Sequence, residues 1–104
     1  MIYEIIIIFK ENFINDKDSI IRKITNDIGE KKILRVRFLK SIKISYPIKK
    51  QTIVNFAFIF CKRGKNIKKI LEKKIRFNKE ILRYMVINVP DEDYKVYLKN
   101  DLSK

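Results

Sequence analysis

The chain has 104 residues, of which 46% are hydrophobic, and it carries 25 Lys and Arg against 12 Asp and Glu, a formal net charge of +13. This length predicts a single domain with one core, and the hydrophobic content excludes a globally disordered chain. A positive charge of this size indicates a polyanionic partner, because Lys and Arg attract phosphates and release their bound counterions.

The first third of the chain has the pattern of a buried strand followed by a helix. Residues 2–9 are nearly all apolar and rich in branched side chains, which is typical of a strand buried on both faces. Isoleucines at positions 20, 21, 24 and 28 then recur at helical spacing. Gly29 suits the position just past the end of that helix, where a left-handed backbone is common.

From Leu34 the period changes to two, which predicts a strand with one apolar and one polar face. The predicted apolar face comprises Leu34, Val36, Phe38, Ile42, Ile44 and Tyr46, and the predicted polar face comprises Arg35, Arg37, Ser41, Lys43 and Ser45. The exposed charges are typical of a strand at the edge of a sheet. Pro47 and the pair Lys49-Lys50 mark the turn that follows.

The second half of the chain repeats the order of strand, helix and strand. Residues 53–61 form another apolar run, typical of a central strand, which Gly64 interrupts. Residues 67–75 place Ile and Leu at helical spacing, with lysines on the other side of the helix. Residues 81–89 have the pattern of a last strand, and Pro90 ends it.

The order of these elements predicts an α+β fold of the ferredoxin-like type. This is a split βαβ sandwich, in which a four-stranded antiparallel sheet carries two helices on one face. The first and third strands are central in that arrangement, and they are also the two most apolar strands. We assign residues 1–89 to this domain and residues 90–104 to a C-terminal tail. The tail forms either a turn of helix around Tyr94, Tyr97 and Leu98 or a frayed end.

The residue types present exclude the common catalytic and metal-binding arrangements. The chain has no His, which is the commonest general base and metal ligand. The single cysteine, Cys61, makes neither an internal disulfide nor a zinc spacing, and we expect it in the core. Two glycines do not make a phosphate-binding loop. We therefore expect no enzymatic activity, no cofactor, no metal site and no small-molecule substrate.

Two segments of the chain stand out, residues 46–50 (YPIKK) and residues 76–86 (RFNKEILRYMV). Both resemble the bacterial small-subunit ribosomal protein S-six family, and their spacing fits that family without a gap. The resemblance implies the split βαβ fold and a structural constituent of the small ribosomal subunit. It also implies binding to the central domain of small-subunit ribosomal RNA together with ribosomal protein S eighteen. At residues 40–42 the sequence is Lys-Ser-Ile, where the family usually carries a glycine followed by arginines.

We expect no segment that directs the protein into or across a membrane. No apolar stretch approaches the ~20 residues of a membrane helix, and the N-terminus begins directly with a strand pattern, without the features of a signal peptide. We therefore expect no membrane partner and a cytoplasmic, ribosomal location in a bacterium or an endosymbiont, with an organelle-encoded ribosome as the other possibility.

The resemblance also implies candidate RNA-binding residues. Arg76 and Arg83 occupy basic positions of the family, and a planar guanidinium grips two phosphate oxygens at once. Asn78 occupies a polar turn, where it either bonds RNA or caps the turn. Lys49 and Lys50 lie on a predicted turn, which either reaches the RNA backbone or is an ordinary solvated loop.

The sheet face that the helices leave open is expected to hold the protein partner, with Tyr3, Phe56 and Phe58 as candidate contacts. Residues 56–59 (FAFI) also resemble part of the aromatic signature of an RNA-recognition motif. A single-stranded RNA-binding module that stacks bases on Phe56, Phe58 and Phe60 is therefore the alternative function. That signature is incomplete, and phenylalanine rings packed beneath the helices are the simpler interpretation.

Two further interpretations stay open. A composition rich in Ile, Lys, Asn and Phe is typical of an AT-rich genome, in which mutational bias raises the Lys count without selection for binding. A module that binds only proteins, through the edge of its sheet, would bind nucleic acid nonspecifically and lose that binding at physiological salt.

Overall fold

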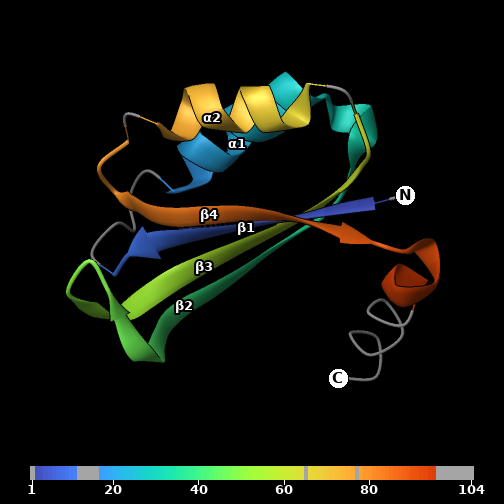
Figure 1. Cartoon of the computed structure of the whole chain (residues 1–104). Helices are drawn as coiled ribbons and strands as arrows, with labels where there is room; N and C mark the ends of the chain where they lie inside the picture. Colours follow the sequence, from blue (N-terminus) through green and yellow to red (C-terminus); the bar gives the residue numbers. More distant parts are fainter. Residues whose placement is uncertain (1, 12–16, 65, 77, 96–104) are drawn as a thin grey trace.

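The computed structural model describes residues 2–11, 17–64, 66–76 and 78–95. Their secondary structure follows the predicted order, with one short 3₁₀ turn, η1, added after the first helix (Figure 1). The elements are β1 (Ile2–Lys10), α1 (Lys17–Ile28), η1 (Glu30–Lys32), β2 (Ile33–Ile48), β3 (Gln51–Lys62), α2 (Ile67–Ile75) and β4 (Ile81–Val89).

The four strands form one antiparallel sheet in the order β2-β3-β1-β4. Figure 1 shows α1 and α2 side by side on one face of this sheet, so the predicted ferredoxin-like fold is confirmed. The most apolar strands, β1 and β3, are central, as their sequences predict. The strands β2 and β4 form the two edges.

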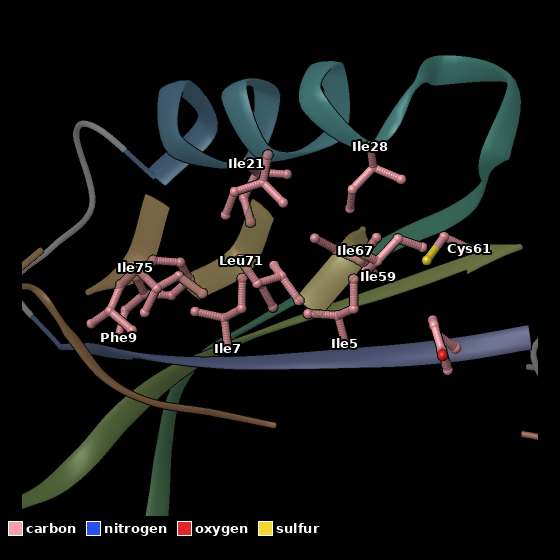
Figure 2. Close-up of a cluster of buried hydrophobic side chains, with 14 residues drawn as sticks. Ile5, Ile7, Phe9, Ile21, Ile28, Ile59, Cys61, Ile67, Leu71 and Ile75 are labelled. Carbon is pink, nitrogen blue, oxygen red and sulfur yellow. The ribbon is translucent and has the colours of Figure 1, made fainter. Parts of the chain in front are cut away.

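The main core lies between the sheet and the two helices (Figure 2). Alternate residues of β1 project toward the helices, because successive side chains of a strand point to opposite faces. Isoleucines at helical spacing on α1 and α2 meet them from the other side. The buried side chains of this core include Ile5, Ile7, Phe9, Ile21, Ile24, Ile28, Ile59, Cys61, Ile67, Leu71 and Ile75.

Cys61 is a fully buried core residue, as predicted. Burial raises the pKa of its thiol to about 11, and the nearby charge of Lys32 acts in the opposite direction. The thiol is therefore protonated at neutral pH and behaves as a small apolar side chain.

The first helix ends just before Gly29, as its sequence indicates, and one ion pair connects the two helices. Gly29 follows α1 with a φ of 108°, and its N–H donates to the carbonyl oxygen of Thr25 over 2.9 Å. An ion pair of 3.1 Å between Lys74 Nζ and Asp27 Oδ2 links the exposed sides of the helices. Both side chains are partly exposed, so this pair contributes little to stability.

The predicted faces of β2 are wrong beyond Leu39, because the strand changes phase at a bulge. Up to that point Arg37 and Leu39 are registered opposite Phe58 and Phe56, on the face away from the helices. The register then shifts, and Ser41 adopts a φ of 53°. An extra residue in a strand reverses which face the following side chains occupy. Beyond the bulge, the apolar side chains of β2 therefore lie on the same face as Arg37.

One buried amide holds this bulge in place. Asn55 of β3 is only 3% exposed, and its Oδ1 accepts a hydrogen bond of 2.9 Å from the Ser41 N–H. Its Nδ2 donates to the carbonyl oxygens of Lys10 and Glu11, each over 3.0 Å. Asn55 thus joins β2 to the end of β1 across β3. All three bonds involve backbone groups, so they fix the path of the chain itself.

The face away from the helices is partly covered by the chain beyond β4. Residues 91–95 are helical, and the Tyr94 ring packs on Phe60 with a centroid distance of 5.2 Å. Ile2 and Val89 complete this small cluster. The predicted turn of helix is therefore present around Tyr94, whereas Tyr97 and Leu98 lie outside the described residues. The domain boundary at residue 89 stays a prediction.

We predict that Asn55→Ala lowers the free energy of unfolding by about 2 to 4 kcal/mol, because it leaves one backbone N–H and two carbonyls near the bulge without their partner. Equilibrium unfolding in urea measures the change. Asn26→Ala, an exposed position on α1, is the matched control and should cost far less. Equal effects of the two variants would contradict the role given to the Asn55 amide.

Candidate nucleic-acid interface

An open hollow of about 610 Å³ surrounds the start of β4. We call it the basic hollow, and its described lining residues are Lys49, Ile75, Arg76, Asn78, Lys79, Ile81, Leu82, Arg83 and Tyr84. It therefore brings together four of the five candidate RNA-binding residues. The fifth, Lys50, is the exposed neighbour of Lys49 in the same turn. Figure 1 shows this turn and the connection from α2 to β4 toward the same end of the sheet.

Lys49 and Lys50 form the two-residue turn between β2 and β3, where Ile48 is registered opposite Gln51. Their φ values are 47° and 69°, so both residues are left-handed. Positive φ at both central residues is the feature of a type I′ hairpin turn, which favours Asn and Gly. A lysine in this conformation costs about 1 kcal/mol relative to those residues. The turn is therefore tight, and it projects two cations at a fixed place.

We call the turn formed by Lys49 and Lys50 the lysine turn. Apolar packing places it across the end of β1, next to the start of β4. Ile44 and Ile48 of β2 pack on a cluster formed by Ile8, Val54 and Leu82. Ile44 lies on the face away from the helices because the bulge has reversed the phase of β2, and the register shifts once more between Lys43 and Ile48. The bulge thus brings Lys49 beside the residues that follow α2.

Asn78 caps the turn between α2 and β4, which confirms the capping interpretation. Its Oδ1 accepts a hydrogen bond of 2.9 Å from the Glu80 N–H, as in an Asx turn. Its own N–H donates to the Ile75 carbonyl over 3.0 Å, and its carbonyl accepts from the Ile81 N–H over 3.2 Å. Asn78 thus fixes the path of the chain from the last turn of α2 into β4.

The rim of the basic hollow is cationic. Arg76 caps the C-terminal end of α2, and Arg83 of β4 is registered opposite Ile8 of β1. Both arginine side chains are exposed. Lys49 and Lys79 add two more positive charges. Among its described lining residues there is no carboxylate. Such a concentration of one sign of charge attracts polyanions.

Two exposed lining residues, Lys79 and Tyr84, are absent from the sequence-based candidates, as are the three buried apolar ones. Lys79 lies within the segment that resembles the ribosomal family, but a lysine in a turn carries no distinguishing signal. Tyr84 has the pattern of a strand residue, and only its position on the edge strand β4 leaves it 37% exposed. The predicted order of strands already makes β4 an edge, but it does not indicate how much of Tyr84 stays exposed there.

The predicted position of Tyr3 on the open face is wrong. Tyr3 is 7% exposed, is registered opposite Cys61 and belongs to the core beneath the helices. Because β1 is apolar on both faces, its sequence does not show which alternate residues meet the helices. Phe56 and Phe58, in contrast, lie half-buried on the open face, with their rings stacked at 5.8 Å and 9°. They are therefore not packed beneath the helices.

The open face is apolar at its centre, and the carboxylate of Glu4 lies among the apolar side chains. Phe58 is registered opposite Ile6, which in turn lies opposite Met85 of β4. Met85 and Ile87 are 39% and 41% exposed. Glu4 of β1 lies on the same face, registered opposite Phe60 of β3 on one side and Ile87 of β4 on the other. Burial among these side chains raises the pKa of the Glu4 carboxyl above its ordinary value.

Two other kinds of functional feature are absent from the described part of the chain. It contains no group of three or more His, Cys, Asp or Glu side chains arranged to hold a metal ion. Nor does it contain a helix with the length and apolar character needed to span a membrane.

The family model of ribosomal protein S6 matches residues 2–88. The chain belongs to this family. A search of curated proteins found no match. The structure is similar to the crystal structure of 30S ribosomal protein S6 from Thermotoga maritima, with a TM-score of 0.77 and 23% identity over 95% of this chain and 96% of that one. It is also similar to an uncharacterized Thermotoga maritima protein, with a TM-score of 0.55 and 12% identity over 86% and 96%.

The match over residues 2–88, which include both segments at residues 46–50 and 76–86, confirms the resemblance to the ribosomal protein S6 family. It supports a structural role in the small ribosomal subunit and an association with the ribosome. The two solved structures have low sequence identity to this chain, so they establish its fold alone.

We predict that the double variant Lys49→Asn and Lys50→Gly raises the free energy of unfolding by about 1 kcal/mol, because Asn and Gly tolerate the left-handed turn better than Lys. Equilibrium urea unfolding measures this change. The control is Lys68→Asn on the exposed side of α2, where the helical backbone should give a small loss. A loss of stability in the double variant would show that the lysines are not strained.

Proposed function

We propose that this member of the ribosomal protein S6 family binds the central domain of small-subunit ribosomal RNA through the rim of the basic hollow, together with ribosomal protein S eighteen. One observation carries the proposal. Lys49 and Arg83, which come from segments far apart in the sequence, line the same hollow as Arg76. The two segments that resemble the ribosomal family therefore line the same hollow, and each contributes cations to it.

The rim residues bind the RNA backbone in different ways. Arg76 and Arg83 each present a planar guanidinium that bonds two phosphate oxygens. Lys49, Lys50 and Lys79 act as point charges that displace counterions. Asn78 contributes mainly by shaping the turn, and its Nδ2 is a hydrogen-bond donor of the kind that phosphates accept. Contacts of these types fix the position of the protein on folded RNA and read little sequence.

The open face of the sheet holds the protein partner in this proposal. Phe58, Met85 and Ile87 offer apolar side chains that a partner can cover. Glu4 lies among them with its charged form disfavoured by burial. A cation of the partner placed beside Glu4 would stabilise the carboxylate, and the apolar surroundings would strengthen the pair. We therefore expect ribosomal protein S eighteen to bring a Lys or Arg to this place.

The alternative function is a module that stacks single-stranded RNA on the open face. The exposure of Phe56 and Phe58 away from the helices favours it. Two contacts oppose it. Phe60 is buried under Tyr94, and the rings of Phe56 and Phe58 already stack on each other. The basic hollow, which lies around the start of β4, has no role in this alternative.

We predict that Arg76→Ala combined with Arg83→Ala weakens binding to a central-domain RNA fragment by at least about tenfold, with ribosomal protein S eighteen present. The slope of log affinity against log salt should fall by about two, since two phosphate contacts are lost. Titrations at several salt concentrations measure both quantities. Circular dichroism melting checks that the double variant remains folded.

The test has one control, and three results would contradict the proposal or favour another function. The control variant Arg22→Ala with Lys23→Ala removes two exposed cations from α1 and should change the affinity much less. Unchanged affinity and slope in the Arg76 and Arg83 variant would contradict the proposal. Loss of single-stranded RNA binding in Phe58→Ala alone would favour the stacking module. Binding that vanishes for every variant at physiological salt would favour a protein-only module.

We predict that Glu4→Gln has opposite effects on the free protein and on partner binding. A raised pKa means that the folded state favours protonated Glu4, so the stability it contributes is lost as pH rises through that pKa. Glu4→Gln should therefore melt at a higher temperature than the parent at neutral pH. The melting temperatures of the variant and the parent should converge at pH values below 4.5, the ordinary pKa of this carboxyl.

The same variant should bind ribosomal protein S eighteen more weakly, because it lacks the charge that a partner cation would pair with. Isothermal titration calorimetry with the purified partner measures this effect. Asp27→Asn, on the exposed side of α1, is the matched control and should leave partner binding unchanged. Partner binding by Glu4→Gln at the parent affinity would remove Glu4 from the interface.

A further inference from the structure

The basic hollow combines two kinds of surface. Its rim is cationic, while its floor consists of Ile75, Ile81 and Leu82, each nearly buried in the protein. Tyr84 stands at the edge of this apolar floor with 37% of its surface exposed. A rim of cations alone would serve to bind the backbone of a regular RNA helix. The floor and the tyrosine ring offer contacts that such a backbone does not use.

The placement of Tyr84 leaves its ring accessible from the side of the sheet. Tyr84 belongs to β4, an edge strand, and is registered opposite Ile7, so it lies on the same face as the helices. It is also next to Arg83, whose side chain belongs to the other face. The two residues therefore present a flat aromatic ring and a guanidinium on either side of one strand edge.

The size and chemistry of the basic hollow match a single nucleotide. A volume of about 610 Å³ is in the range of small-molecule sites. An unpaired nucleotide has a flat apolar base, which stacks on aromatic side chains, and charged phosphates on both sides of it. A paired nucleotide inside a regular helix keeps both faces of its base stacked between neighbours, so neither face is available to a tyrosine ring.

We propose that the basic hollow takes one unpaired nucleotide of folded RNA, with its base against Tyr84 and the apolar floor. The flanking phosphates then bind Arg76 and Arg83, with Lys49 and Lys79 beside them. This inference rests on the proposed function, because it names the kind of RNA element that the same rim binds. It assigns Tyr84 the role of selecting a bulged or looped nucleotide over an uninterrupted helix.

The test compares two RNA hairpins with the same stem, one of which contains a single unpaired 2-aminopurine and the other none. The full-length protein should bind the bulged hairpin about tenfold more tightly. The fluorescence of 2-aminopurine should fall on binding, because stacking on an aromatic ring quenches it. This second measurement uses the parent protein alone and does not depend on any variant.

Variants of Tyr84 locate the contact. Tyr84→Thr keeps a residue suited to strands and should bind both hairpins equally, while Tyr84→Phe should keep the preference for the bulge. Asn88→Thr is the matched control, since Asn88 is an exposed residue of β4 that lies on the same face as Tyr84 but outside the basic hollow. It should behave as the parent does. Thermal melting of each variant confirms that it is folded.

The outcomes separate this inference from the proposed function. Equal affinity of the parent for the two hairpins, or unchanged 2-aminopurine fluorescence, would overturn the nucleotide site. A preference for the bulge that survives in Tyr84→Thr would also overturn it. In each of these cases Arg76→Ala with Arg83→Ala would still weaken binding to both hairpins if the proposed function is correct. If that double variant binds both hairpins as the parent does, the proposed function itself fails.

Discussion

The position of the lysine turn depends on three hydrogen bonds made by the Asn55 side chain. This amide, which belongs to β3, connects the bulge at Ser41 of β2 to the end of β1. Because the bulge reverses the phase of β2, Ile44 lies on the face away from the helices, where it and Ile48 pack on the cluster that contains Leu82. The turn that follows is thereby drawn over the end of β1 to the start of β4. A single buried polar group thus connects the register of the sheet to the composition of the basic hollow.

Much of the fold follows from local patterns that the sequence displays directly. The order of elements and the central positions of β1 and β3 could be predicted, because long apolar runs and helical spacing survive in any tertiary context. The bulge could not, because Ser41 carries no signal for a positive φ, and strict alternation was the natural expectation for β2. Tyr3 was misplaced for a related reason, since a strand that is apolar on both faces has no pattern to orient it.

The sequence predicts only part of the arrangement of the candidate site, namely the placement of residues that lie close together along the chain. Arg76, Asn78 and Arg83 lie within one short segment, so a family resemblance alone places them near one another. Lys49 reaches them only through tertiary packing of the hairpin on Leu82. Tyr84 looks like an ordinary strand residue, and its exposure arises from the position of β4 at the edge of the sheet. The sequence therefore identifies most of the charged residues of the site. Which apolar and aromatic side chains lie beside them depends on the tertiary structure.

The backbone of the lysine turn bears on whether the basic composition reflects selection or mutational bias. An AT-rich genome favours both Asn and Lys, and Asn suits a left-handed turn better than Lys does. Bias alone therefore gives no reason for lysine at both positions, where the φ values are 47° and 69°. Strained residues persist where the surrounding structure holds them, and they often lie at functional sites. The two lysines at this turn are better explained by the charge they bring to the hollow than by the composition of the chain.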